Sequence, residues 1–237
     1  VERRPDTRLP SDPANVQLSA PLDDTDVTRI LHWIQDECNV LCESKNVIWD
    51  CVIELAKRNS YHPIKLFLNS VKTKWDGTSR VPGLLTRYFG AQDNELHRAY
   101  AICFLVAAVA RVLRPGSKVD TMLVLKGPQG ARKSSTLGAL FNPWFSDTPI
   151  RIGDRDGYML LRKAWLHELG ELASLKKNDV ESIKTFLSSC EDTFRAPYER
   201  TAKAVPRENV FAGSTNAEQF LSDDTGARRF HVVEVGF

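Results

Sequence analysis

The sequence predicts an α/β protein in which a largely parallel sheet follows an all-helical region. Between residues 25 and 115, apolar side chains recur at the three- and four-residue spacing of amphipathic helices. After Pro115-Gly116, short apolar runs of strand length alternate with helical stretches, as in a parallel sheet with crossover helices. We therefore expect a linker or arm over residues 1–24, a helical domain over 25–116 and a sheet-containing core over 117–237.

Length and composition fit a soluble globular chain of one large or two small domains. Of the 237 residues, 42% are hydrophobic and 26% are charged, which excludes a disordered tail, a fibre or a low-complexity scaffold. The 32 lysines and arginines nearly balance the 30 aspartates and glutamates, so the net charge alone indicates no polyanionic partner. The 12 apolar residues between Arg98 and Arg111 are too few for a membrane helix, which needs roughly 20. We expect them to form a buried core helix, with no membrane partner.

The cysteines predict neither a disulfide framework nor a zinc site, because their number is odd and no paired CxxC spacing occurs. We expect them to fill small apolar gaps on helices, in a reducing cytosolic protein without a signal peptide. The chain begins with Val1 and ends at Phe237 inside a strand-like run, so we expect a piece of a longer protein, truncated at its C-terminus. The cysteines are Cys38, Cys42, Cys51, Cys103 and Cys190.

The helical region contains five stretches with an apolar face. A turn over residues 75–80 precedes the fourth helix, and we expect Trp75 to hold this turn against the core. Gly90 ends the fourth helix and Pro115 follows the fifth, as is typical of residues that stop helices. The predicted helices cover residues 27–34, 47–55, 62–68, 84–89 and 94–113.

The second region contains four short apolar runs that we predict to be core strands, separated by helical stretches or turns. An amphipathic helix is expected over residues 178–190. Alternation around a turn predicts a β-hairpin over residues 193–205. The predicted strands cover residues 121–125, 164–167, 209–213 and 229–235.

A glycine-containing loop, GPQGARKS over residues 127–134, follows the first predicted strand and opens a helix. This is the context of a P-loop, where backbone N–H groups and a helix N-terminus surround the phosphates of a nucleotide. Lys133 would reach the β- and γ-phosphates, and the Ser134 hydroxyl would bind Mg²⁺. Arg132 departs from the usual pattern, which has glycine directly before the lysine. The alternative is a glycine-rich turn that contains a lysine by chance. The predicted ATP-binding residues are Gly127, Gln129, Gly130, Ala131, Arg132, Lys133, Ser134 and Ser135.

Two glutamates follow the second predicted strand, in the segment WLHELGE over residues 165–171. Ligands of an open α/β sheet lie at the carboxyl ends of its strands. We predict that Glu168 holds Mg²⁺ together with Ser134, and that Glu171 orients the attacking water. The three-residue gap differs from an adjacent acidic pair, and ordinary surface acids are the alternative. We expect His167 to be a hydrogen-bonded core histidine rather than a ligand.

Polar residues also follow the third predicted strand and precede the fourth. The amide of Asn216 would sense the γ-phosphate or help to hold the attacking water, with a simple polar turn as the alternative. Arg228 and Arg229 follow a tight turn. An arginine supplied to the nucleotide of a neighbouring subunit would stabilise transition-state charge, and ordinary surface arginines are the alternative.

Basic and aromatic residues interleave in the predicted hairpin. Basic groups would follow the backbone of single-stranded nucleic acid while rings stack on its bases. A solvated hairpin without a ligand is the alternative. The segment carries Phe194, Arg195, Tyr198, Arg200, Lys203 and Arg207 against one acid, Glu199.

The chain resembles the virulence-associated protein E family, the helicase-like part of phage and plasmid primase-helicases. That family is similar to the superfamily 3 helicases among the AAA+ P-loop ATPases. The resemblance extends along nearly the whole chain from about residue 25 and depends on the order and spacing of six segments. They are WDGTSRV (75–81), GPQGARKSS (127–135), WLHELGEL (165–172), FRAPYER (194–200), FAGSTN (211–216) and TGARRF (225–230).

The resemblance implies a DNA-translocating ATPase that uses ATP and Mg²⁺ and forms a homo-oligomer, a hexameric ring, on single-stranded or forked DNA. It also implies a primase region or primase partner, and a phage- or plasmid-encoded protein in the cytoplasm of a bacterial host. The resemblance implies that Lys133 and Ser134 are nucleotide ligands, that Glu168 is the acidic residue at the strand end and that Asn216 is the sensor. It implies that Arg195, Arg200 and Lys203 contact DNA in the pore. Arg228, with Arg229 as substitute, would be the arginine that acts in trans.

Two other hypotheses stay open beside the helicase. One is a nucleotide-binding interaction module that does not hydrolyse ATP, which Arg132 and the spaced glutamates motivate. The other is a DNA-binding adaptor whose P-loop is vestigial. ATP turnover, ATP binding without turnover, and DNA binding that is indifferent to ATP distinguish the three.

Overall fold

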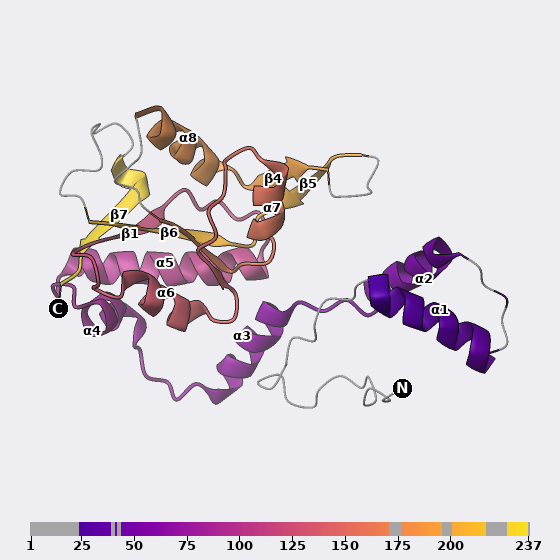
Figure 1. The fold of residues 1–237 in the computed structure, drawn as a ribbon. Helices are drawn as coiled ribbons and strands as arrows, with labels where there is room; N and C mark the ends of the chain where they lie inside the picture. The colour runs from indigo at the N-terminus through magenta and orange to yellow at the C-terminus, as the bar shows by residue number, and fades with distance from the viewer. Residues whose placement is uncertain are drawn as a thin grey trace. The chain divides into compact units, whose positions relative to one another are not determined.

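The computed structural model in Figure 1 describes residues 24–38, 41, 44–170, 177–195, 201–216 and 227–236. The chain forms two compact units, Val1–Lys74 and Trp75–Phe237, which we describe separately. The predicted linker over residues 1–24 lies almost entirely outside the described residues. The unit that contains the sheet already begins at Trp75, because the last two helices of the predicted helical domain belong to it.

The first unit contains α1 (Asp24–Cys38), α2 (Lys45–Arg58) and α3 (Pro63–Lys74). α1 and α2 pack through the buried side chains of Val27, Leu31 and Ile48. The apolar spacing in the sequence predicts an apolar face on each helix, and the structure buries part of each face in this contact. Trp33 and Ile53 on the same two helices are exposed, so each helix buries only a narrow apolar stripe.

The second unit is built on a five-stranded sheet with the order β2-β3-β6-β1-β7. All neighbouring strands are parallel, so the carboxyl ends of the five strands meet at one edge. The predicted α/β fold with a parallel sheet is therefore confirmed. Four strands match the predicted runs, whereas β2 has too few residues to show a strand pattern. The strands are β1 (Met122–Lys126), β2 (Phe145–Ser146), β3 (Leu166–Leu169), β6 (Val210–Thr215) and β7 (Phe230–Glu234).

Helices cover both faces of this sheet (Figure 1). On one face, Met122 and Val124 join a core cluster with side chains of α7 (Arg155–Leu161) and α8 (Lys177–Ser188). On the other face lie α5 (Glu95–Leu113) and α6 (Lys133–Phe141). Phe104 of α5 and Trp165 both meet the ring of Phe141 edge-on, with centroids 5.7 and 5.0 Å away. The three inner strands β1, β3 and β6 are thus buried on both sides, as is typical of parallel strands.

Shorter elements complete the second unit. The predicted hairpin is present as β4 (Glu191–Phe194) paired antiparallel with β5 (Lys203–Pro206), although its tip over residues 196–200 lies outside the described residues. α4 (Leu84–Phe89) ends at Gly90, whose left-handed φ of 66° confirms the predicted stop. The 3₁₀ turns η2 (Val81–Gly83) and η4 (Ala227–Arg229) precede α4 and β7.

Arg111 is a fully buried arginine that connects α5 to the starts of two strands. Its guanidinium donates to four backbone carbonyl oxygens that precede β1, precede β6 or follow α8. Burial lowers the pKa of Arg111 to about 10, so the side chain remains a cation at neutral pH. The acceptors are Ser117 at 3.2 Å, Val119 at 2.8 Å, Ser189 at 3.4 Å and Asn209 at 2.9 Å.

α5 is not the wholly buried helix that its apolar sequence predicts. Phe104, Ala108 and Val112 are buried, whereas Val106 on another side of the helix is 59% exposed. Among the described residues, α5 is also the one helix whose length and composition would allow it to cross a membrane. The core helix of a globular domain passes the same test.

Two further predictions are wrong. Trp75 is 66% exposed and donates its indole N–H to the Thr78 carbonyl at 3.2 Å, so it stabilises its own turn rather than pinning it to the core. Cys51 and Cys103 are exposed and Cys190 is half-buried, so these three cysteines do not fill apolar gaps in the core. In each case a residue that is usually buried lies on a surface of the unit.

His231 gives the second unit a predicted sensitivity to acid. It is stacked on Tyr100 with ring centroids 4.1 Å apart, and burial lowers its pKa below the usual 6.5. The folded state therefore favours the neutral ring. This contribution to the free energy of unfolding is fully present above about pH 6.5 and is lost as the pH falls through the lowered pKa. Urea unfolding followed by tryptophan fluorescence should show a smaller loss of stability on acidification in His231→Gln than in wild type.

The exposed His32 offers the matched control. His32→Gln should keep the wild-type pH dependence. If His231→Gln loses stability on acidification as steeply as wild type, the half-buried His231 does not contribute to the acid response.

Candidate functional site

The loop between β1 and α6 is held at its entrance by two neighbouring strands. The Gly127 N–H donates to the Thr215 carbonyl at the end of β6, at 3.1 Å. A Cβ atom at Gly127 would lie 2.2 Å from the carbonyl oxygen of Val235, just beyond β7, so a side chain cannot be accommodated there. Gly130 in the middle of the loop has a φ of +86°, which favours glycine. The strand, glycine-containing loop and helix that the sequence predicts are therefore present.

Arg132 occupies the position where the P-loop pattern has glycine, and it adopts the left-handed conformation that glycine would adopt, with φ 51° and ψ 25°. For a residue with a Cβ atom this costs about 1–2 kcal/mol. Its carbonyl oxygen nevertheless accepts from the Thr136 N–H at 2.9 Å and from the Thr136 hydroxyl at 3.0 Å, so α6 begins normally. Arg132 in place of glycine therefore raises the energy of the turn, while the backbone keeps the left-handed conformation from which α6 begins.

Lys133 and Ser134 stand at the first turn of α6, where backbone N–H groups have no acceptor within the helix. The Lys133 ammonium donates to the carbonyl oxygens of Gly127 and Pro128, both at 2.8 Å, so it lies over the loop. The Ser134 hydroxyl donates to Glu168 Oε1 at 2.8 Å. A loop residue and a carboxylate 34 positions later in the chain thus come into direct contact.

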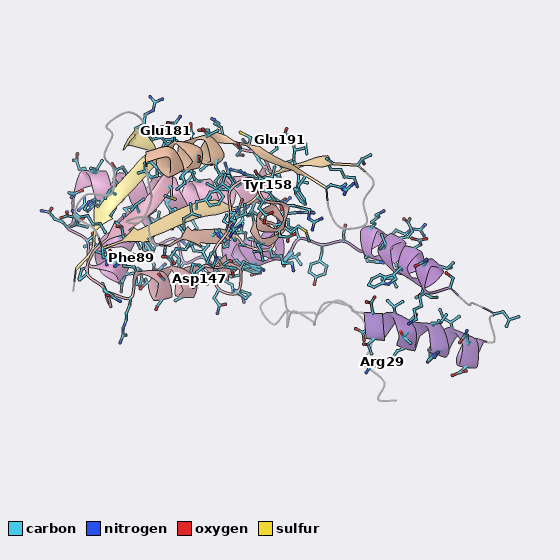
Figure 2. All side chains as sticks on the ribbon, turned by 45° about the horizontal axis from the view of Figure 1, so that its top comes forward. Arg29, Phe89, Asp147, Tyr158, Glu181 and Glu191 are labelled. Carbon is cyan, nitrogen blue, oxygen red and sulfur yellow. The ribbon has the colours of Figure 1, made fainter. Side chains whose placement is uncertain are left out.

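Glu168 is 97% buried at the carboxyl end of β3, and its second oxygen has no hydrogen-bond partner among the described residues. Its hydrogen-bond partner Ser134 also lines a cavity of about 300 Å³, together with Ser135 and Asp147. Asp147, labelled in Figure 2, directly follows β2, the neighbour of β3. Hydroxyl and carboxylate oxygens are the ligands that Mg²⁺ prefers, so the Ser134–Glu168 pair suits this ion. The described residues contain no cluster of three or more His, Cys, Asp or Glu side chains that would bind a metal by itself.

Asn216 lies at the same edge of the sheet. It directly follows β6, the strand between the loop-bearing β1 and the acidic β3, and its side chain is exposed. Lys126 is in register with Thr215, and Leu169 is in register with Gly213. The parallel register therefore places the P-loop, Glu168 and Asn216 at the same edge, with Glu168 level with Ala212 and Asn216 four residues further along the chain. Glu171 lies outside the described residues.

Arg228 and Arg229 lie at the opposite edge. They form η4 immediately before β7, whose first residue Phe230 is in register with Met122 at the start of β1. The length of β1, about 13 Å at the rise of a parallel strand, separates them from the P-loop of their own chain. Arg228 is exposed, and the Nε of Arg229 is buried without a hydrogen-bond partner among the described residues.

Of the predicted nucleic-acid residues, Arg195 and Lys203 are exposed at the ends of the two hairpin strands, and Tyr198 and Arg200 lie outside the described residues. Two further residues of this segment are not on its surface. Phe194 is buried and stacks on Tyr158 with centroids 6.1 Å apart. Arg207 is buried and binds both carboxylate oxygens of Asp192, so it stabilises the base of the hairpin instead of adding surface charge.

His167 is a core histidine, as predicted, but it is not hydrogen-bonded. Both ring nitrogens are buried without a partner among the described residues. Burial lowers the pKa of His167 to about 4, against a smaller opposing effect of the Asp147 carboxylate, so the ring is neutral at pH 7. The neutral ring packs edge-on against Phe211, with the two ring centroids 6.4 Å apart.

The model of the virulence-associated protein E-like domain matches residues 68–236, which is most of the chain. The chain belongs to the virulence-associated protein E-like family. The resemblance of the six sequence segments to this family is thereby confirmed. A search of curated proteins gives no significant match.

Solved structures of another protein show partial similarity to this virulence-associated protein E-like domain. The A form apo structure of the NrS-1 C terminal region has 17% sequence identity and a TM-score of 0.47, over 66% of this chain and 37% of that one. The apo structure of the same region, residues 305–718, has 16% identity and a TM-score of 0.45, over 66% and 38%. This chain thus spans less than two fifths of the length of those structures.

Asp147 and Tyr88 are the residues near the loop that the sequence analysis misses. Asp147 follows a strand of two residues, which is too short to show periodicity. Tyr88 belongs to a six-residue helix far from the P-loop in sequence, yet it lines a cavity beside residues 128–132 of this virulence-associated protein E-like domain. The only sequence signal for Asp147 is the segment FSD, in which a polar residue and an acid follow an aromatic residue. The only signal for Tyr88 is an aromatic residue directly before Phe89.

Proposed function

We propose that this chain is the ATPase module of a DNA helicase or translocase in a phage or plasmid replication protein, active in the cytoplasm of a bacterial host. The observation that carries the proposal is the contact between Ser134 of the P-loop and the buried Glu168. A glycine-rich loop that contains a lysine by chance has no need of a buried carboxylate at its first helical turn. The pairing is what nucleotide hydrolysis with Mg²⁺ requires.

Each part of the site has a role in this proposal. The loop amides and Lys133 would bind the β- and γ-phosphates of ATP, and Ser134 and Glu168 would hold Mg²⁺ through their oxygens. The ion, when bound, neutralises charge on the phosphate oxygens. Asn216 and Glu171 would orient the attacking water near the terminal phosphate. Gln129, Ala131 and Ser135 would contribute backbone or hydroxyl contacts to the phosphates.

The two edges of the sheet suit an oligomer, and we extend the proposal to a homo-oligomeric ring, a hexamer. Arg228 and Arg229 lie on the edge opposite their own P-loop. They would therefore act on the nucleotide of a neighbouring subunit, where positive charge stabilises the transition state. Hydrolysis would then take place at subunit interfaces.

The exposed hairpin would contact single-stranded or forked DNA inside such a ring. Arg195 and Lys203 carry positive charge on adjacent strands of the hairpin, since Phe194 is in register with Lys203. With Tyr198 and Arg200 of the tip, they would follow the phosphate backbone and stack on bases. A primase region or primase partner would act upstream of this module.

A second candidate function is nucleotide binding without hydrolysis. Arg132 favours it, because a residue with a strained left-handed backbone stands where a P-loop normally has glycine. DNA binding with a vestigial loop is less well supported, because the Ser134–Glu168 contact would then have no purpose.

ATPase measurements with and without single-stranded DNA test the main proposal. Lys133→Ala should reduce the ATPase rate at least about a hundredfold, because the charge on the β- and γ-phosphates loses its partner. The exposed Lys163, changed to alanine, provides a control that should keep wild-type activity. Equal rates in wild type and Lys133→Ala would sink the assignment. ATP binding without turnover in wild type, even with DNA, would establish the second candidate.

Mixing two inactive variants tests action between subunits. Arg228→Ala supplies an intact P-loop and Lys133→Ala supplies an intact arginine, so an interface between them can combine both. An equimolar mixture should recover part of the ATPase activity that each variant lacks alone. A mixture as inactive as its components would argue against an arginine that acts in trans.

The salt dependence of DNA binding tests the hairpin. Each phosphate contact to single-stranded DNA contributes about 0.7 to the slope of log K against log salt, so Arg195→Ala with Lys203→Ala should lower that slope by about 1.4. Arg151→Ala with Lys163→Ala removes two exposed charges elsewhere and should leave the slope unchanged. The same slope in both double variants would place the DNA contacts outside the hairpin.

A further inference from the structure

Two adjoining cavities lie beside the P-loop, on the side of Thr136. The first, of about 590 Å³, is lined by Tyr88, Thr136 and loop residues 128–132. The second, of about 370 Å³, also has Tyr88 and Thr136 in its wall and continues between η2, α4, α5 and α6. Because Tyr88 and Thr136 line both, the two cavities adjoin, and together they form a hollow that extends from the phosphate-binding loop to an apolar recess.

The recess is suited to a flat apolar ring. Its wall is mostly hydrophobic, and Tyr88, which lines both cavities, is 49% exposed. The Arg87 guanidinium lies 5.8 Å from the centroid of the Tyr88 ring, so a stacked base would use the part of the ring that Arg87 leaves open. The charged lining residue, Arg80, is already bound to Asp76 at 2.9 and 2.5 Å. The lining residues are Arg80, Val81, Leu84, Tyr88, Phe89, Leu105, Thr136, Ala139 and Leu140.

The first turn of α6 separates this hollow from the acidic side of the loop. Ser134 and Ser135 line the cavity that contains Asp147, and Ser134 contacts Glu168. Thr136, the next residue, lines the hollow at Tyr88 instead. A triphosphate with its terminal phosphate at Ser134 would therefore direct its other end toward Tyr88.

We propose that Tyr88 and the apolar recess behind it bind the base of the nucleotide whose phosphates lie on the P-loop. This inference rests on the proposed function and adds the half of the site that the P-loop pattern does not specify. It also gives a role to the segment over residues 75–81. The Trp75–Thr78 and Asp76–Arg80 contacts hold that turn, so that Arg80 and Val81 form one wall of the recess.

The test separates the base from the phosphates. Binding of adenylyl-imidodiphosphate, a non-hydrolysable ATP analogue, is compared by calorimetry with binding of inorganic tripolyphosphate, both with Mg²⁺. Tyr88→Ala should weaken the analogue about tenfold or more, since base–aromatic stacking is lost, and should leave tripolyphosphate within about twofold. Tyr88→Phe keeps the ring and should retain wild-type binding. Tyr61→Ala, at a tyrosine that is 52% exposed, is the matched control and should bind both ligands normally.

The outcomes distinguish a failure of the base site from a failure of the proposed function. Unchanged binding of the analogue to Tyr88→Ala, or equal weakening of both ligands, overturns the base site while leaving the P-loop intact as a phosphate site. The melting temperature of each variant shows whether a loss comes from unfolding. Wild type that binds neither ligand, or Lys133→Ala that binds both as well as wild type, overturns the proposed function and the base site with it.

Discussion

The buried guanidinium of Arg111 is the interaction on which the second unit depends. It bridges one helix, α5, to the backbone before β1, before β6 and after α8. A buried cation is costly unless hydrogen bonds replace its water, and four carbonyl oxygens do so here. The bridge thus holds together the backbone segments from which β1 and β6 begin. Because the two strands run parallel from there, the P-loop after β1 and Asn216 after β6 reach the same edge.

The sheet separates the two halves of the proposed chemistry. The loop, Glu168 and Asn216 occupy its carboxyl edge, and the arginines of η4 occupy its amino edge. Within one copy the length of β1 keeps these groups apart, so the proposed contact between them needs a second copy of the chain. Head-to-tail contacts of this kind either close into a ring or continue as a filament, and the proposed ring is the closed case.

The sequence predicts the elements that depend on local pattern and fails where contacts are distant. β1, β3 and β6 are runs buried on both faces, β7 is a short apolar run, and the loop carries its own glycines, so strands and loop were predictable. The exposure of Trp75 and the burial of Arg207 were not, because each depends on which surface covers it. Arg207 lies inside because Asp192, fifteen residues earlier, neutralises it there. Tyr88 is recognisable as part of the site only once α4 is seen beside the loop. The roles of the site residues remain predictions.

The strand order has a consequence for how the protein is made. β1 is an inner strand, yet both its neighbours, β6 and β7, come from the last part of the chain. A ribosome that adds about 5–20 residues per second leaves β1 without either partner for several seconds. During that interval a five-residue apolar segment, MLVLK, has two unpaired edges that another chain can join. The nascent protein should therefore need chaperone protection between the emergence of β1 and that of β7, and fragments that stop before residue 210 should aggregate.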